Sequence, residues 1–199
     1  MRNHTYERLA AFLSRCSREE LLASFSEPWM NEVIPGVWKL AGCNQGTKNH
    51  FEGDVAVHTS FVFENLSSTA KRRLGRMPDF IEQMSAVLHD LKKPETRLED
   101  GTGGVTFPGH EHRAADEVAS IAGRLDLALE EEERLLFVVA RHGDAHEYLK
   151  LSAREKAELT MSPFIESLAL LQEADALSCI LPDRTHLPVF WEILMLKVP

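Results

Sequence analysis

The chain has 199 residues, of which 44% are hydrophobic and 27% charged, and its formal net charge is −9. This length and composition predict a single soluble globular domain over residues 1–199. The acidic balance argues against bulk nucleic acid as a partner, because neutralising phosphates requires a surplus of Lys and Arg. No apolar stretch approaches the ~20 residues that span a bilayer, and the N-terminus lacks the apolar core of a signal peptide. With three cysteines (Cys16, Cys43 and Cys179) and no CxxC pair, we expect a reducing, cytoplasmic location and no membrane partner.

Apolar residues at helical spacing dominate the first half of the chain. The helices expected there span 6–13 and 19–25, then 29–42 as a helix broken in its middle. A further helix begins near Asp54, and another spans 79–91. The helix expected at 19–25 follows a capping box of Ser17 and Glu20. The helix that begins near Asp54 carries His58 on its apolar stripe, and the polar stretch 43–53 before it is expected to be a loop. Lys71 to Arg73, followed by Gly75 and Pro78, predict a solvated basic helix end.

The second half follows the same pattern after a long loop at 92–109, in which residues 101–104 form a flexible turn. The helices expected there span 110–125, 130–141, a short segment after the capping box of Ser152 and Glu155, 163–178, and 189–196. Nothing alternates with period two for long enough to predict a sheet. We therefore expect a compact all-α bundle. The last segment, 189–196, is apolar nearly all round, so it belongs either to the core or to a homodimer interface.

The pair His89-Asp90 is the most informative feature of the sequence, because two metal-ligating side chains end a strongly apolar run. A carboxylate is rarely buried unless it is paired or binds an ion. Asp175 is a second carboxylate inside an apolar helix, and His58, His110 and His142 lie on or at the ends of the other helices. A lone histidine of this kind is often structural, and His142 at a helix end also complements the helix dipole. Taken together, the six residues predict a metal site.

Imidazole nitrogen and carboxylate oxygen suit Mn, Fe, Co, Ni or Zn better than Ca, and Mg also accepts such carboxylates. An ion held this way lowers the pKa of bound water to about 7 and makes hydrolysis feasible at neutral pH. The sequence does not decide between one ion and two.

The order of these motifs resembles the HD-domain superfamily of metal-dependent phosphohydrolases. Within it, the chain is most similar to the HD domain that follows the nucleotidyltransferase head of bacterial CCA-adding tRNA enzymes. The similar segments are 53–59, 88–94, 109–111, 141–146 and 173–175, within a motif-bearing core of about residues 30–180. The residues before Met30 leave no room for a nucleotidyltransferase head, so we expect a free-standing hydrolytic domain and no CCA addition.

The resemblance implies roles for individual residues. The first metal would be bound by His58, His89, Asp90 and Asp175, and the second by His110 and His142 with Asp90 as a bridge. Lys93 matches a lysine that reaches the substrate phosphate, and Arg113 would help it to stabilise charge. His146 or His112 would protonate the leaving group, while His50 and Asp54 would orient His58.

These roles predict a metal-dependent phosphohydrolase, with Asp90, Lys93 and His146 as catalytic residues. Its substrate would be a nucleotide, a 2′,3′-cyclic nucleotide or a small phosphorylated metabolite, contacted by His50, Lys93, His112, Arg113 and His146. Two alternatives remain open. A few HD-type proteins use a di-iron site to activate O₂, and others are non-catalytic modules that bind a ligand or partner.

Overall fold

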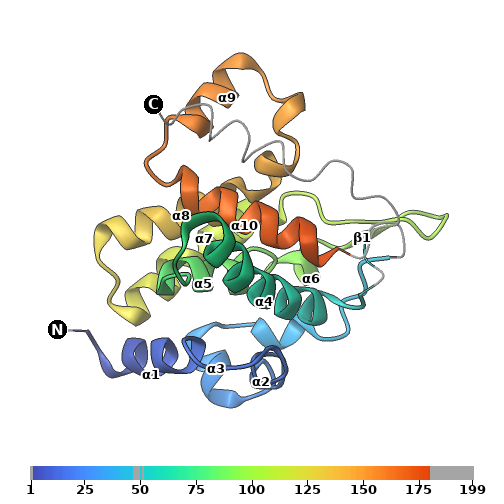
Figure 1. Cartoon of the computed structure of the whole chain (residues 1–199). Helices are drawn as coiled ribbons and strands as arrows, with labels where there is room; N and C mark the ends of the chain where they lie inside the picture. Colours follow the sequence, from blue (N-terminus) through green and yellow to red (C-terminus); the bar gives the residue numbers. More distant parts are fainter. Residues whose placement is uncertain (1, 47–49, 51, 180–199) are drawn as a thin grey trace.

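The computed structural model describes residues 2–46, 50 and 52–179. These residues are mainly helical, which confirms the all-α prediction (Figure 1). The α-helices are α1 (His4–Leu13), α2 (Arg18–Ser24), α3 (Pro28–Val33), α4 (Val55–Leu74), α5 (Phe80–Leu88), α6 (Lys93–Thr96), α7 (His110–Leu125), α8 (Leu129–His146), α9 (Ala153–Thr160) and α10 (Ile165–Ser178). Two 3₁₀ turns, η1 (Val37–Leu40) and η2 (Tyr148–Lys150), and two strands, β1 (Leu98–Glu99) and β2 (Val105–Thr106), complete the described part.

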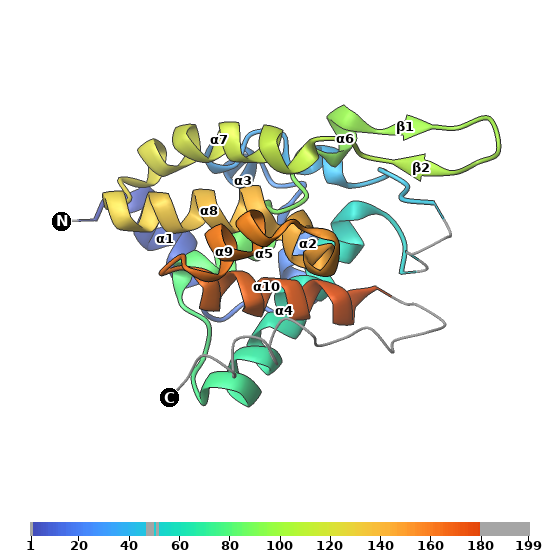
Figure 2. The same cartoon turned by 90° about the horizontal axis from the view of Figure 1, so that it is seen from above.

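Helix α10 lies at the centre of the bundle, against α4, α8 and α5. Seen from above, α7, α8, α10 and α4 lie side by side in this order (Figure 2). Leu168 and Leu171 on one side of α10 and Leu170 on the other are fully buried, so the helix is covered on opposite sides. Helices α1 to α3 pack below this layer (Figure 1). A carboxylate on α10 is therefore placed in the middle of the molecule.

Short-range sequence signals correctly located several helix ends. The capping boxes of Ser17 with Glu20 and Ser152 with Glu155 are both formed. Residues 29–42 are broken between α3 and η1, where Gly36 takes a positive φ of 83° that favours glycine. These features depend on neighbouring residues alone, which is why a single sequence reveals them.

One helix is longer than predicted. Helix α8 does not end at residue 141 but continues to His146, so His142 lies inside the helix and one turn before His146. Gly143 lies inside this helix and allows α7 to approach closely, because a Cβ at this position would lie 2.7 Å from Glu111 Oε1.

The predicted loop 92–109 contains α6 and an antiparallel β1–β2 hairpin. Asp100 closes this hairpin by accepting hydrogen bonds from the Thr102 and Gly104 amides. Side-chain hydrogen bonds of this kind build a turn without any apolar periodicity.

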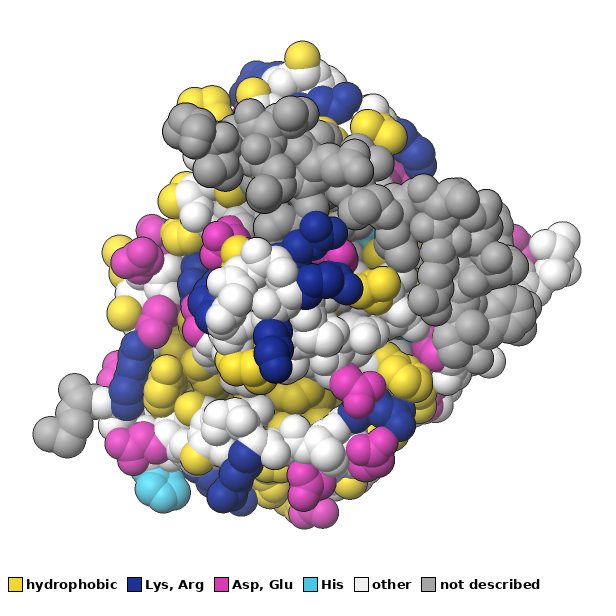
Figure 3. Space-filling model, viewed as in Figure 1, with side chains coloured by type: hydrophobic (Ala, Val, Ile, Leu, Met, Phe, Trp, Pro, Cys, Tyr) yellow, Lys and Arg dark blue, Asp and Glu magenta, His cyan; other side chains and the backbone are white. Residues whose placement is uncertain are grey.

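The basic end of α4 is not simply solvated. Arg72 and Arg73 both bond the carboxylate of Glu173 at 2.8 Å, and Arg76 pairs with Glu82 at 2.7 Å. Glu173 and Glu82 are buried, and buried carboxylates require such partners. The face drawn in Figure 3 accordingly mixes basic and acidic side chains.

Among the described residues, no helix is both long and apolar enough to cross a membrane. The helix predicted at 189–196 lies outside the described residues. The extent of the domain, 1–199, stays a prediction.

Candidate metal centre

Five helices bring the six predicted ligands to one place. His58 comes from the first turn of α4, His89 and Asp90 from the end of α5, His110 from the start of α7, His142 from α8 and Asp175 from α10. Relative exposure is 9% or less for all six residues. Their ligand atoms form two compact groups, His58–His89–Asp175 and Asp90–His110–His142. The structure thus contains buried His/Asp groups that can hold a metal ion.

Backbone carbonyls orient three of the imidazoles in the same way. The Nδ1 atoms of His89, His110 and His142 lie 2.9, 2.8 and 2.8 Å from the carbonyl oxygens of Ala86, Phe107 and Val139, each three residues earlier. This contact requires a proton on Nδ1, so the neutral ring has its free lone pair on Nε2. All three Nε2 atoms point to Asp90, as metal ligands do when a second contact fixes their tautomer.

Asp90 lies where these imidazoles meet. Its Oδ1 is 3.1 Å from His110 Nε2 and 3.8 Å from His142 Nε2, and its Oδ2 is 3.2 Å from His89 Nε2. Within the described part of the chain, the buried Nε2 atoms of His89 and His110 have no hydrogen-bond partner. A nitrogen lone pair facing a carboxylate oxygen at this distance requires a proton or a metal cation between them.

The pKa values of His142 and Asp90 bear on whether a proton or a metal ion lies between these groups. Burial and the neighbouring His89 lower the pKa of His142 to about 3, so this ring stays neutral and keeps a lone pair. Burial opposes ionisation of Asp90, but His89 and Lys93 hold the pKa of this carboxyl well below its usual range. A neutral imidazole beside an ionised carboxylate is the protonation state that a divalent transition metal requires. The donor set therefore fits a metal ion, and the metal's identity stays a prediction.

His58 is held differently, between two carboxylates. Its Nε2 lies 2.9 Å from Asp175 Oδ1, and its Nδ1 lies 2.9 Å from Glu52 Oε1. Despite burial, hydrogen bonds to Asp175 and Glu52 raise the pKa of His58 to about 9 in the absence of metal. With a metal on Nε2, Glu52 would accept the Nδ1 proton, as carboxylates beside metal-bound histidines commonly do.

Glu52 was not predicted as a partner of His58; the orienting role was expected of His50 and Asp54, and His50 contacts Glu52 at 2.6 Å. The Asp54 carboxylate instead caps α4, where it accepts hydrogen bonds from the Val57 and Gly42 amides at 3.0 and 2.6 Å. Asp54 has the position of an N-cap residue, and this local role competes with any contact to His58. Glu52 lies two residues before Asp54 and was visible in the sequence as a second carboxylate. No local pattern, however, predicts where its side chain points.

Lys93, the first residue of α6, pairs with the carboxylate of Asp90. Its Nζ lies 2.7 Å from Asp90 Oδ2 and 2.8 Å from Gln45 Oε1, 5.2 Å from the centre of the Phe107 ring. Although burial opposes it, the charge of Asp90 raises the pKa of Lys93, so the ammonium stays charged. Asp90 and Gln45 are the acceptors of Lys93 among the described residues, and Lys93 also lines the adjoining pocket.

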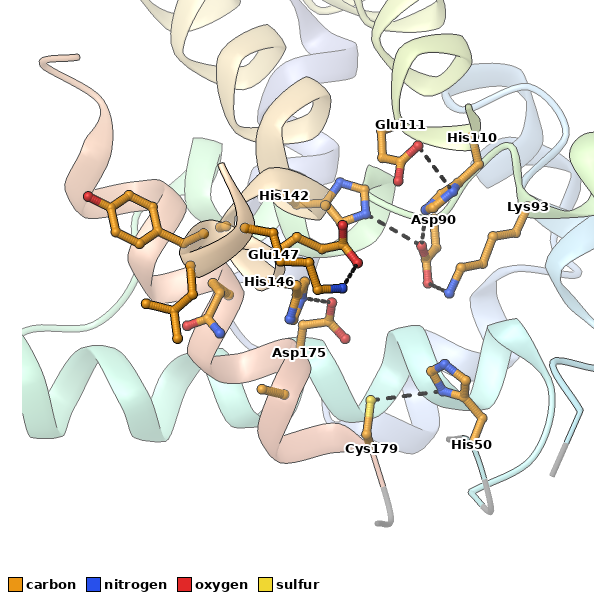
Figure 4. A pocket seen from close by; sticks show the side chains of 17 residues that line it. His50, Asp90, Lys93, His110, Glu111, His142, His146, Glu147, Asp175 and Cys179 are labelled. Atoms are coloured by element: carbon orange, nitrogen blue, oxygen red, sulfur yellow. Dashed lines mark hydrogen bonds and ion pairs between the residues drawn. The ribbon is translucent and has the colours of Figure 1, made fainter. Parts of the chain in front are cut away.

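A pocket of about 530 Å³ opens beside the metal-ligand groups. Figure 4 shows Asp90, His110 and Lys93 directed toward one another at one end of it, and His146 beside Asp175. His146 Nε2 lies 2.7 Å from Asp175 Oδ2. The pocket thus joins the metal-ligand groups to a charged lysine and a part-exposed histidine.

The predicted substrate-contacting residues are distributed unevenly. His50, Lys93 and His146 line the main pocket. His112 is exposed and lines a smaller adjoining hollow, together with His146. Arg113 is exposed on α7 and lines neither space. Contacts of His112 and Arg113 with a substrate therefore stay predictions without support from the pocket geometry.

A comparison with known proteins finds a distant relative. The chain is 25% identical over 152 residues to the "Multifunctional CCA protein" of Aromatoleum aromaticum. The aligned region covers 75% of this chain and 33% of the relative. The chain thus spans about a third of that protein's length. No family model matches the chain. The similarity agrees with the resemblance seen in the motifs.

Proposed function

We propose that the protein is a metal-dependent phosphohydrolase that acts on a nucleotide, a 2′,3′-cyclic nucleotide or a small phosphorylated metabolite. The observation that carries this proposal is the convergence of imidazole Nε2 atoms and two carboxylates beside a charged, buried lysine at the end of a pocket. A metal ion held by these ligands and the Lys93 ammonium would together bind the non-bridging oxygens of a phosphate ester. The distant similarity to a "Multifunctional CCA protein" is compatible with this proposal.

The side chains would hold the ion in two linked sets. His58, His89 and Asp175 would form one set and His110 and His142 the other, with Asp90 between them. A divalent ion bound there supplies Lewis acidity and lowers the pKa of a water molecule. Backbone carbonyls and Glu52 hold the imidazoles in the ligating tautomer, so little reorganisation is needed on binding.

Lys93 and His146 would act on the substrate. The Lys93 ammonium would bind a phosphoryl oxygen, while Asp90 and Gln45 hold it at the pocket. His146 is 31% exposed at its side chain and rests on Asp175. From there it would carry a proton to the oxygen of the leaving group.

Elemental analysis of the purified, untagged protein tests this proposal, together with phosphate release in the presence of Mn, Co, Ni, Mg or Zn. The substrates would be 2′,3′-cyclic nucleotides, nucleoside monophosphates and sugar phosphates. Metal binding with phosphate release is expected. Bound iron with oxygen consumption and no phosphate release would favour the di-iron alternative, and no metal after ample supply would favour a binding module.

A further inference from the structure

A second group of ligand-type side chains lies beside the first, at the junction of the segment before α4 with the end of α10. His50 Nδ1 lies 2.6 Å from Glu52 Oε1 and 3.9 Å from the Sγ of Cys179. His58 Nδ1 lies on the other side of the same Glu52 oxygen, at 2.9 Å. One ligand atom from each of these four residues lies within 4.8 Å of the others. Figure 4 shows His50 and Cys179 facing each other at the pocket wall.

The donors differ in kind from those around Asp90. Nitrogen, carboxylate oxygen and sulfur are the three ligand types that zinc combines in proteins, whereas the other two groups contain no sulfur. The Glu52 side chain is completely buried, so its charge is compensated locally. Cys179 lies near Asp175 and Glu52, both anionic, and these charges favour a cation at the sulfur.

We propose that His50, Glu52 and Cys179 form a further divalent-metal site of zinc type, distinct from the His/Asp groups. Binding would replace the thiol proton of Cys179 by the metal and release that proton to solvent. His50 and Cys179 line the pocket, so the fourth position of a tetrahedral ion would open toward it. His58 would keep its Nδ1 proton on Glu52, which links the new site to the ligand set around Asp175.

This site also connects two distant parts of the chain. His50 and Cys179 are separated by 129 positions in the sequence, and Cys179 follows α10 as its C-cap. An ion bound by both would fix the end of the helix that carries Asp175. The proposal does not depend on the phosphohydrolase activity, because it concerns binding alone.

Titration of the metal-free full-length protein with Co²⁺, followed by absorption spectroscopy, tests the proposal. A thiolate ligand gives an intense sulfur-to-cobalt charge-transfer band in the near ultraviolet, which nitrogen and oxygen ligands do not give. We expect this band in the wild-type protein, its loss in Cys179→Ser and in His50→Ala, and its displacement by Zn²⁺. It should persist in Cys16→Ser, a matched control at a half-buried thiol in another part of the fold.

The Asp90→Asn variant separates the new site from the His/Asp groups. The band should persist in this variant, while total bound cobalt falls. No band at saturating cobalt, or an unchanged band in Cys179→Ser, would overturn the proposal. If Cys179→Ser fails to fold by circular dichroism, loss or retention of the band in His50→Ala decides in its place.

Discussion

Replacing Asp90 by Asn should abolish metal binding at the His/Asp groups. Asp90 is the residue whose two oxygens face His110 and His142 on one side and His89 on the other. The amide keeps the shape of the carboxylate but loses its charge, and its nitrogen is no metal ligand. The same change removes the ion-pair partner of Lys93 at 2.7 Å. Breaking a buried pair in this way costs about 3–5 kcal/mol, so each protein must be compared with its own metal-free form.

The expected size of the effect follows from linkage between binding and folding. An ion at a hundred times its Kd stabilises the native state by about 2.7 kcal/mol. For a chain of 199 residues, each kcal/mol raises Tm by about 2–4 °C, so saturation should raise the wild-type Tm by about 5–11 °C.

Thermal unfolding with and without Mn²⁺, which disfavours sulfur ligands, gives the assay, and elemental analysis of the same samples counts the bound metal. The Asp90→Asn variant should show little Tm shift, whereas the control Asp116→Asn, exposed on α7, should respond like the wild type. A variant with unchanged manganese stoichiometry and an unchanged shift would refute the assignment of Asp90 as the shared ligand.

Three further predictions address the pocket, the core and the thiols. Lys93→Met should lower kcat by about 10²–10³ with metal content retained, since one charged donor is lost. The control Lys92→Met should have little effect, because the ammonium of Lys92 pairs with Glu95 and Glu117. Equal losses in both variants would contradict the role of Lys93. Leu170→Ala should destabilise the protein by about 2–5 kcal/mol in urea unfolding, because Leu170 is fully buried in the central helix; a loss below 1 kcal/mol would contradict this packing. Burial raises the pKa of the Cys16 thiol from 9.0 to about 11. In a variant with Cys16 as its single cysteine, alkylation at pH 8 should therefore be roughly a hundredfold slower in the native protein than in the urea-unfolded protein, and the native rate should rise up to about pH 11. Equal rates in the native and unfolded states would contradict this prediction.

The sequence predicted the helices and the ligand types because both depend on local signals. Apolar periodicity placed His58 on a buried face, and an apolar run ending in His89 and Asp90 marked buried polar groups. The extent of α8 was not predictable in the same way, because a glycine inside a helix is normally unfavourable. Gly143 packs closely against Glu111, a contact between two helices that no local pattern contains.

The partners of the ligands depend on tertiary structure, and this is where the sequence was least informative. Glu52 and Asp54 are both carboxylates just before the helix that carries His58, and only the path of the chain decides that Asp54 caps α4 while Glu52 reaches the imidazole. Gln45 likewise bonds Lys93 across 48 positions, although neither residue predicts the other.

The contacts of Glu52 and Gln45 orient charged or polar groups and do not extend the hydrophobic core. Glu52 hydrogen-bonds a histidine that is a predicted metal ligand, and Gln45 hydrogen-bonds an ammonium that lines the pocket. If this reasoning is right, Gln45→Leu should weaken the proposed substrate binding by Lys93, with a raised KM and unchanged metal content. An unchanged KM together with a lower melting temperature would instead show that Gln45 serves only to satisfy a buried ammonium.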